Sequence, residues 1–309
     1  MVLPGGLVKP ILAIVGPTAT GKSDLAVKLA KKYDGEVISA DAFQLYKRMD
    51  IGTAKIKKTE MQGVRHHLID ILEPNESFSA SDYQKMVREK IELVSKEGRM
   101  PIVVGGSGFY IKAALYEYEF PGEKRNDELT AEYSDYDNSE LYGILEKQDP
   151  QLAKTIHPNN RRRILRSLEI VGTGSNEFRK KGSIPFYDNI LLIGLRMDRK
   201  ELYKQIDERV DRMIENGLVE EAKALFDAGI TGQSISAIGY KELFMFFRNE
   251  IRNEEAFDLI KRNSRRYAKR QLTWFKNQMD VTWFDVTNDN RITLYDEIVN
   301  YIEKKGEEI

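Results

Sequence analysis

The sequence predicts an α/β protein, with a core of parallel strands flanked by helices and a helical insertion within it. Three features support this prediction. Short, continuous apolar runs at 11–16 and 101–106 are flanked by glycine or proline, as in strands that are buried on both faces. A glycine-containing loop follows the first run and leads into a helical pattern. Sheet-like runs then stop near residue 118 and resume at residue 189.

Strands and helices are expected to alternate in the core. The expected strands are 11–16, 35–41, 101–106 and 189–197, and the expected helices before the insertion are 24–32 and 81–97. Such alternation is typical of a parallel sheet with right-handed crossovers. Beyond residue 197, apolar residues from Tyr203 to Leu225 recur close to the helical period. We expect the rest of the C-terminal third to continue as helix.

The segment 118–188 is expected to form the helical insertion, between core portions 1–117 and 189–309. It lacks sheet-like runs, and its charges are segregated. Between Glu123 and Asp149 there are nine acidic residues against three basic ones, whereas Arg161 to Lys181 holds seven basic against two acidic. The change in charge pattern and the lack of sheet-like runs together indicate an insertion.

Composition excludes several classes of protein. The chain has 309 residues, a net charge of −1 and 31% charged residues, so no global field indicates a polyanionic partner. It has no cysteine, which excludes disulfides, thiolate zinc sites and cysteine nucleophiles. Its three histidines lie in two separate regions, so a histidine metal site is not expected. No run is long enough for a membrane span or a secretory signal, and we expect a cytoplasmic protein.

A phosphate-binding loop is the strongest motif. The sequence GPTATGKS at 16–23 matches G-x-x-x-x-G-K-[ST] between an expected strand and helix, which is the context that the motif requires. Backbone amides and the helix N-terminus would bind a diphosphate or triphosphate, Lys22 would add a cation, and the Ser23 hydroxyl suits Mg²⁺. The motif does not specify ATP. The expected phosphate ligands are Gly16, Thr18, Ala19, Thr20, Gly21, Lys22 and Ser23.

Two further stretches lie at expected strand ends. Asp41 falls near the carboxyl end of the strand at 35–41, at the edge where open α/β sheets bind ligands. Its carboxylate suits a general base, a metal ligand or a salt-bridge partner, and spacing does not choose between them. Ser107 lies in the glycine loop GGSG at 105–108 after another strand. This loop fits close approach to a ligand or a tight structural turn equally well.

Two basic segments point to RNA. Arg161, Arg162, Arg163 and Arg166 lie within six positions, and residues 261–279 hold seven basic residues, no acidic one and interleaved aromatic rings. Cations suit phosphates and rings suit unstacked bases. Each run alone fits a solvated helix face as well, but two such runs together with a phosphate loop favour RNA.

These motifs together resemble the bacterial tRNA dimethylallyltransferases, which prenylate adenine in tRNA. The resemblance covers nearly the whole chain. Its specific part is the order of blocks, at 16–23, 39–55, 66–84, 103–115, 156–170, 198–218, 237–243 and 266–275. It implies a core with the fold of P-loop nucleoside triphosphatases. It also implies an insertion that closes on the anticodon stem-loop. It also implies that the loop holds dimethylallyl diphosphate, and that the acceptor is the exocyclic N6 amine of the adenine 3′ to the anticodon.

The resemblance implies roles for individual residues. Asp41 would be the general base, Lys22 and Arg199 would stabilise the departing diphosphate, and Mg²⁺ would sit near Ser23. Gln44 and Ser107 would lie near the adenine, which must leave its stack. The remaining implied tRNA contacts are Asp41, Ala42, Phe43, Arg162, Arg163, Ile164, Leu165, Arg166, Ser236, Ala237, Ile238, Gly239, Tyr240 and Lys241. We expect a monomer with no membrane partner.

The chain departs from the family pattern at three places. Ala42 replaces the usual serine after the aspartate, Ser107 replaces a threonine, and the stretch from 175 to 189 is unusual. Three rival functions stay open on the residues alone. A small-molecule kinase would use the same loop for ATP, an isopentenyltransferase of free adenine nucleotides would need no insertion, and a non-catalytic RNA-binding protein would need no base.

Overall fold

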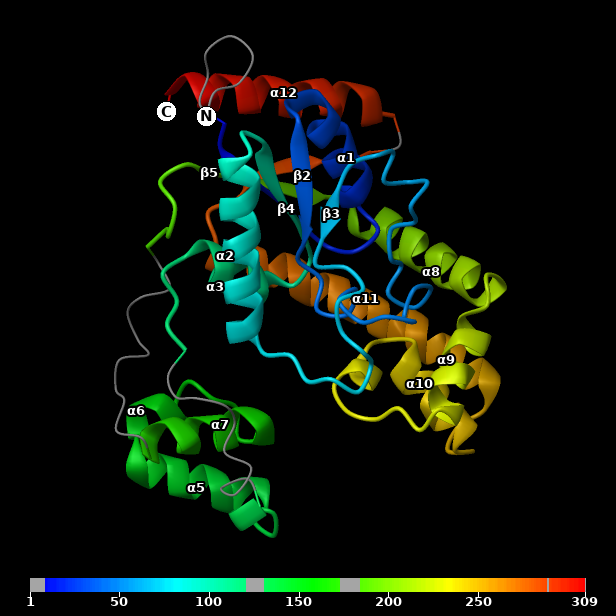
Figure 1. Ribbon diagram of the computed structural model, residues 1–309. Coiled ribbons are helices and arrows are strands. Elements are labelled where there is room, and N and C mark those ends of the chain that lie inside the picture. The colour runs from blue at the N-terminus through cyan, green and yellow to red at the C-terminus, as the bar shows by residue number, and fades with distance from the viewer. Residues whose placement is uncertain (1–8, 121–130, 173–183, 288, 309) are drawn as a thin grey trace. The chain divides into compact units, whose positions relative to one another are not determined.

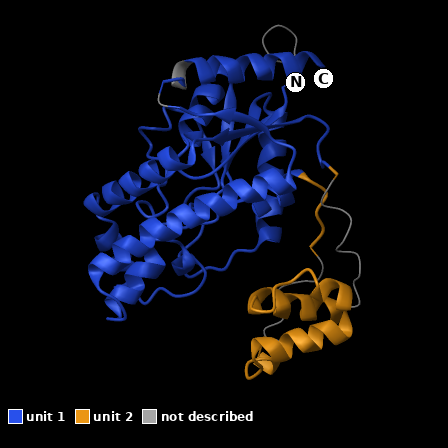
Figure 2. Cartoon of the chain, turned by 180° about the vertical axis from the view of Figure 1, so that it is seen from behind, with its two compact units in different colours: residues 1–115, 185–309 blue, residues 116–184 orange. Residues whose placement is uncertain are grey.

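The computed structural model describes residues 9–120, 131–172, 184–287 and 289–308 (Figure 1). The chain forms two compact units (Figure 2). Unit 1 comprises residues 1–115 and 185–309, and unit 2 comprises residues 116–184. Each unit has its own buried apolar cluster.

Unit 1 is built on a parallel sheet. The strands in its described part are β1 (Ile11–Val15), β2 (Gly35–Ser39), β3 (His66–His67), β4 (Met100–Gly105), β5 (Ile190–Arg196) and β6 (Thr282–Asp285). Their order across the sheet is β3-β2-β4-β1-β5-β6, and every neighbouring pair is parallel. The α/β fold and the four strands expected from the apolar runs are confirmed.

The helices of unit 1 lie partly against this sheet and partly beyond its lower end in Figure 1. They are α1 (Lys22–Tyr33), α2 (Ala80–Lys96), α3 (Gly108–Leu115), α8 (Arg199–Glu215), α9 (Leu218–Asp227), α10 (Tyr240–Phe247), α11 (Asn253–Gln278) and α12 (Arg291–Glu308), with a short 3₁₀ turn η2 (Ser234–Ser236). α2 begins where a capping box forms, because Ser79 Oγ accepts a hydrogen bond from the Asp82 N–H over 3.1 Å and the Asp82 carboxylate accepts one from the Ser79 N–H.

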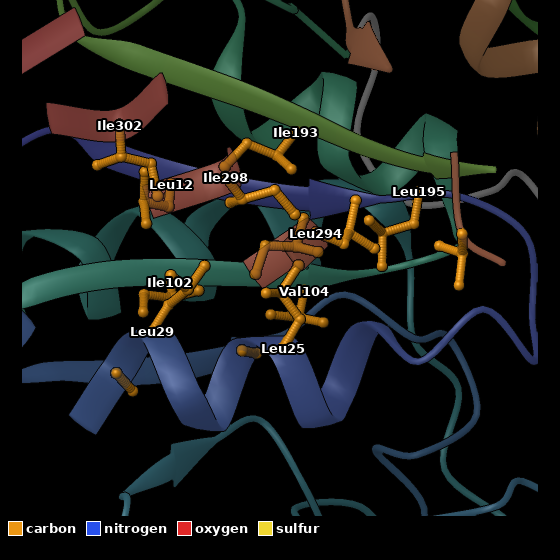
Figure 3. Packing of buried hydrophobic residues seen from close by; sticks show 14 of the residues in the cluster. Leu12, Leu25, Leu29, Ile102, Val104, Ile193, Leu195, Leu294, Ile298 and Ile302 are labelled. Atoms are coloured by element: carbon orange, nitrogen blue, oxygen red, sulfur yellow. The ribbon is translucent and has the colours of Figure 1, made fainter. Parts of the chain in front are cut away.

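The main core lies between the sheet, α1 and α12 (Figure 3). Leu25 and Leu29 of α1 and Ile298 of α12 meet the strand residues Leu12 and Ile102. Strands covered on both faces need apolar side chains in both directions, which is why these runs are continuous rather than alternating. All five residues of β1 are buried.

The strand β6 was missed by the sequence analysis, which expected helix throughout the C-terminal third. Its four residues pair with β5 in register, with Trp283 beside Gly194. A Cβ atom at Gly194 would lie 2.6 Å from the Trp283 ring, so the glycine leaves room for the indole. A four-residue edge strand has no apolar run of its own, and the periodicity of the sequence could not reveal it.

Unit 2 is helical in its described part, with α5 (Asn138–Gln148), α6 (Pro150–Ala153) and α7 (Arg161–Gly172). α5 starts at a capping box made by Asp137 and Glu140. Leu141 and Leu145 of α5 pack with apolar residues of α7. Among the described residues of both units, none of the helices combines the length and hydropathy that crossing a bilayer requires.

Candidate active site

Glycines let the loops at the carboxyl ends of neighbouring strands approach one another. A Cβ atom at Gly16 would lie 2.3 Å from the carbonyl oxygen of Leu195, and one at Gly105 would lie 2.1 Å from that of Ala40. Side chains are excluded at such distances. The loops after β1, β2 and β4 therefore meet at one edge of the sheet, and α11 runs past this edge (Figure 1).

The phosphate loop, residues 16–23, has the backbone of an anion-binding turn. Gly16 and Gly21 have φ angles of 137° and 84°, in the range that glycine adopts without strain. α1 begins at Lys22, within the last two residues of this motif, and Gly21 offers no capping side chain. The N–H groups of the first helical turn have no intrahelical partners, so together with the helix dipole they suit a phosphate.

Two cations lie at this loop. The Lys22 Nζ donates to the Pro17 carbonyl over 2.6 Å, and the Arg209 Nη1 donates to the Thr18 Oγ1 over 2.7 Å. Burial lowers the pKa of Lys22 to about 7; repulsion from Arg209 adds to this shift and the charge of Asp41 opposes it. Burial also lowers the pKa of Arg209, although a guanidinium stays charged. Two partly desolvated cations at one loop favour an anionic ligand.

Asp41 faces the same cations from the end of β2. Its Oδ1 accepts hydrogen bonds from the N–H groups of Phe43 over 2.9 Å and Gln44 over 3.4 Å. This Asx turn fixes the carboxylate. Its charge favours the protonated forms of both Lys22 and Arg209. A fixed, half-buried carboxylate beside an anion site is suited to accept a proton.

The second glycine loop, residues 105–108, contacts the Asp41 turn. The Ser107 Oγ accepts a hydrogen bond from the Ala42 N–H over 3.3 Å. The Tyr267 hydroxyl of α11 is hydrogen-bonded to Ser107. Burial, with a contribution from the charge of Asp41, raises the pKa of Tyr267 to about 12, so the phenol keeps its proton at neutral pH. The loops that carry Asp41 and Ser107 are thus joined by hydrogen bonds.

Comparison with known proteins narrows the class of site. The sequence profile of the IPP transferase family matches residues 44–278, well over half of the chain. The chain belongs to the IPP transferase family. This membership confirms the resemblance that the sequence blocks carried.

Relatives of this IPP transferase cover nearly the whole chain. The tRNA dimethylallyltransferase of Bacillus licheniformis is 47% identical over 307 residues, which is 96% of this chain and 98% of the relative. That of Bacillus subtilis is 48% identical over 290 residues, 90% of this chain and 91% of the relative.

Solved structures are similar over the same length. The tRNA isopentenylpyrophosphate transferase of Bacillus halodurans has a TM-score of 0.76 at 46% identity, and covers 97% of this chain and 98% of its own. A eukaryotic dimethylallyltransferase acting on tRNA has a TM-score of 0.81 at 27% identity, and covers 96% and 80%.

Within this IPP transferase, Arg199 and Arg209 occupy different places on α8. Arg199, the cation that the resemblance implied, is exposed at the start of the helix, with its guanidinium 5.2 Å from the ring centroid of Tyr203. Of these two arginines, Arg209 is the one that contacts the phosphate loop, and the motifs did not predict it. A signal was available, because Arg209 lies on the same helix face as the buried Leu202 and Ile206, where a cation calls for an explanation.

The three residues that follow Asp41 make different kinds of contact. The Gln44 side chain is engaged within the protein: its Oε1 accepts from the Ser39 hydroxyl over 3.2 Å and its Nε2 donates to the Thr53 carbonyl over 3.3 Å. Phe43 packs against an apolar cluster formed with α9 and α10. Ala42 contributes its N–H to Ser107 and no polar side chain. Gln44 therefore stabilises the loop around Thr53.

The five residues from 162 to 166 differ in their exposure to solvent. Arg162 and Arg163 are exposed on α7, and Arg166 pairs with Glu169 over 2.7 Å. The resemblance implied tRNA contacts for the whole run, but Ile164 and Leu165 are buried in the core of unit 2. Their side chains support the arginine surface and do not form it.

The stretch 236–241 has a similar division. Ser236 and Lys241 are exposed and Ile238 is half-buried, whereas Ala237 and Gly239 are buried. Tyr240 is 0% exposed, and its hydroxyl donates to the Glu221 carboxylate over 2.5 Å. The Tyr240 ring is therefore part of the buried core, and the tRNA contact that the resemblance implies for this residue stays a prediction.

The basic segment 261–279 lies mostly in α11, and its rings do not form an exposed stacking surface. Phe275 is fully buried, and Trp274 fills the space beside Gly108, where a Cβ atom would lie 2.1 Å from the indole. Lys261 and Arg265 pair with acidic residues of α8. The cations exposed to solvent on α11 are Arg262, Arg266, Lys269, Arg270 and Lys276. Of the three rings that the sequence placed among these cations, Phe275 is buried and Tyr267 and Trp274 are half-buried, so the fully exposed side chains of this segment include its cations and none of its rings.

Proposed function

We propose that this chain transfers a dimethylallyl group from dimethylallyl diphosphate to the N6 amine of the adenine 3′ to the anticodon in tRNA, with release of diphosphate. The observation that carries the proposal is the convergence of the phosphate loop, Arg209 and Asp41 at one edge of the sheet. Membership of the IPP transferase family supports this reaction against the rival kinase.

The diphosphate side of the reaction requires charge stabilisation. The C1–O bond of the allylic substrate breaks and its electron pair goes to the departing diphosphate. Amides of the loop and of the first turn of α1, the Lys22 ammonium and the Arg209 guanidinium would stabilise that developing charge. We assign the further cation to Arg209 rather than Arg199, because Arg209 contacts the loop.

The acceptor side requires removal of a proton. The exocyclic amine of adenine is a weak nucleophile, since its lone pair is delocalised into the ring. As the N6–C1 bond forms, the nitrogen gives up one proton, which passes to the Asp41 carboxylate. The hydrogen bonds from Phe43 and Gln44 hold that carboxylate in place.

A magnesium ion at this site would need the phosphates of the substrate among its ligands. Among the residues that the structure describes, no group of three or more His, Cys, Asp or Glu side chains is placed to hold a metal ion. Mg²⁺ commonly binds through one or two protein oxygens together with substrate phosphates and water. The exposed Ser23 hydroxyl at the start of α1 is such a ligand. The ion would supply further neutralisation of the diphosphate charge.

Exposed cations in both units would hold the tRNA. Arg162 and Arg163 of α7 are exposed in unit 2. Lys241 and the exposed cations of α11 are the corresponding groups of unit 1. Contacts of this kind act on phosphates, so they position the RNA and contribute a salt-dependent affinity.

One competition assay tests the proposal. The protein receives dimethylallyl diphosphate, ATP and Mg²⁺ together with unmodified tRNA, and in parallel with AMP, and mass spectrometry follows prenyl and phosphoryl groups separately. The expected result is prenylated tRNA, with no prenylated AMP and no phosphate transfer. Prenyl transfer to AMP would instead support the free-nucleotide enzyme. Phosphate transfer without prenylation would support the kinase.

A further inference from the structure

One face of α11 is packed along the second glycine loop and α3. The residues of this face, which we call the α11 seam, are Tyr267, Gln271, Trp274 and Gln278, at spacings of four, three and four. Each of them has a partner on the stretch 106–112: Ser107 for Tyr267, Gly106 for Gln271, Gly108 for Trp274 and Lys112 for Gln278.

Of the four seam residues, Gln271 is the one whose contacts with other described residues include the phosphate loop. Its Oε1 accepts a hydrogen bond from the Thr18 N–H over 3.1 Å, and its Nε2 donates to the Gly106 carbonyl over 3.0 Å. The side chain is 6% exposed. Each amide atom faces a partner of the opposite kind, so only one orientation of the amide satisfies both loops.

The surroundings allow little other adjustment. A Cβ atom at Gly106 would lie 2.0 Å from the Gln271 Nε2 and 3.4 Å from the Gly16 carbonyl, so the two loops and the amide are in close contact. The other side of Thr18 is held by Arg209. Beyond Gly106, Ser107 is hydrogen-bonded to the turn that carries Asp41.

We propose that Gln271 is a positioning residue that fixes the separation between the diphosphate loop and the loop beside the general base. This inference rests on the proposed function. Transfer needs C1 of the dimethylallyl group in line with the amine that Asp41 deprotonates, and these two groups are held by the two loops that Gln271 joins. A misplacement of about 1 Å costs about 100-fold in rate.

The test compares three variants with wild type. Gln271→Met keeps the side-chain length and removes the hydrogen bonds to Thr18 and Gly106, together with the one to Tyr267. Gln271→Glu keeps the acceptor for Thr18 but turns an acceptor toward the Gly106 carbonyl, and it serves if the methionine variant does not fold. Gln278→Met is the matched control, at the exposed end of the same seam. The measurements are the single-turnover rate of tRNA prenylation at saturation, the Kd of each substrate and the melting temperature.

Both Gln271 variants are expected to lose about 10-fold to 100-fold in the single-turnover rate. The Kd values for tRNA and dimethylallyl diphosphate should stay within about threefold, because the groups proposed to bind them remain. A single-turnover rate within threefold of wild type in either folded variant overturns the role. A loss that resides in Kd with an unchanged rate does so as well. Wild-type protein that transfers no prenyl group overturns the proposed function, and this inference with it.

Discussion

Binding of the diphosphate to Lys22 should be accompanied by proton uptake. The pKa of Lys22 is lowered to about 7, first by burial and then by Arg209, so above pH 7 the free protein holds a mostly neutral amine. An anion in the loop favours the ammonium form and raises this pKa. Binding therefore takes up a proton, and affinity falls as the pH rises above 7.

The magnitude follows from the two protonation states. At pH 8, a group with a pKa of about 7 is ~0.9 neutral, so binding should take up ~0.9 protons if the bound ammonium titrates well above pH 9. The Kd should then rise by nearly tenfold per pH unit between pH 8 and 9. This is an upper limit, since Lys22 is partly exposed and solvent screens its interactions.

Isothermal titration calorimetry measures this uptake directly. Dimethylallyl diphosphate is titrated into the protein at pH 8 in buffers of different ionisation enthalpy, and the slope of the observed enthalpy gives the number of protons. The terminal phosphate, with a pKa of about 6, is already ionised at this pH. Lys22→Arg is the control, because a guanidinium stays charged and should take up none. Equal uptake in both proteins, or none in wild type, would refute the assignment of the proton to Lys22.

Three further predictions concern the base, the RNA surface and the loop contact. Asp41→Asn keeps the Oδ1 acceptor of the turn. It should lower the single-turnover rate of prenylation by about 100-fold or more and leave the affinity for tRNA unchanged. A loss of less than tenfold in this rate would contradict a role as general base. Replacing Arg162 and Arg163 together with Gln should weaken tRNA binding and reduce its salt slope by up to about 2, whereas the exposed Arg248→Gln should not. Gly106→Ala should destabilise the protein by about 1–3 kcal/mol in thermal unfolding, because its Cβ would meet Gln271, whereas the unobstructed Gly143→Ala should not destabilise it.

Local rules predicted most of the core. The runs around β1, β2, β4 and β5 are short, apolar and bounded by glycine or proline, and these features act within a few residues of each other. The phosphate loop was predicted for the same reason, since its glycines and its helix are contiguous in sequence. The strand β6 was not, because it exists only through pairing with β5.

The sequence predicted only part of the site. The motifs named Lys22, Asp41 and Ser107, all next to strand ends, and the structure brings their loops to one edge of the sheet. Motif spacing did not name Arg209 or Gln271, which approach the loop from α8 and α11. Helical residues far along the chain reach a loop only through tertiary packing.

By itself the sequence determined the fold class, the phosphate loop and the order of motifs that identifies the family, since these depend on residues that are neighbours in the chain. The tertiary structure decided which cation contacts the loop and which implied contacts are buried. The Arg209 Nη1 lies 2.7 Å from the Thr18 Oγ1, whereas Arg199 is exposed. The Tyr240 side chain is buried in the core. The physical reason is that burial and long-range contact depend on how distant elements pack, and no local pattern records that packing.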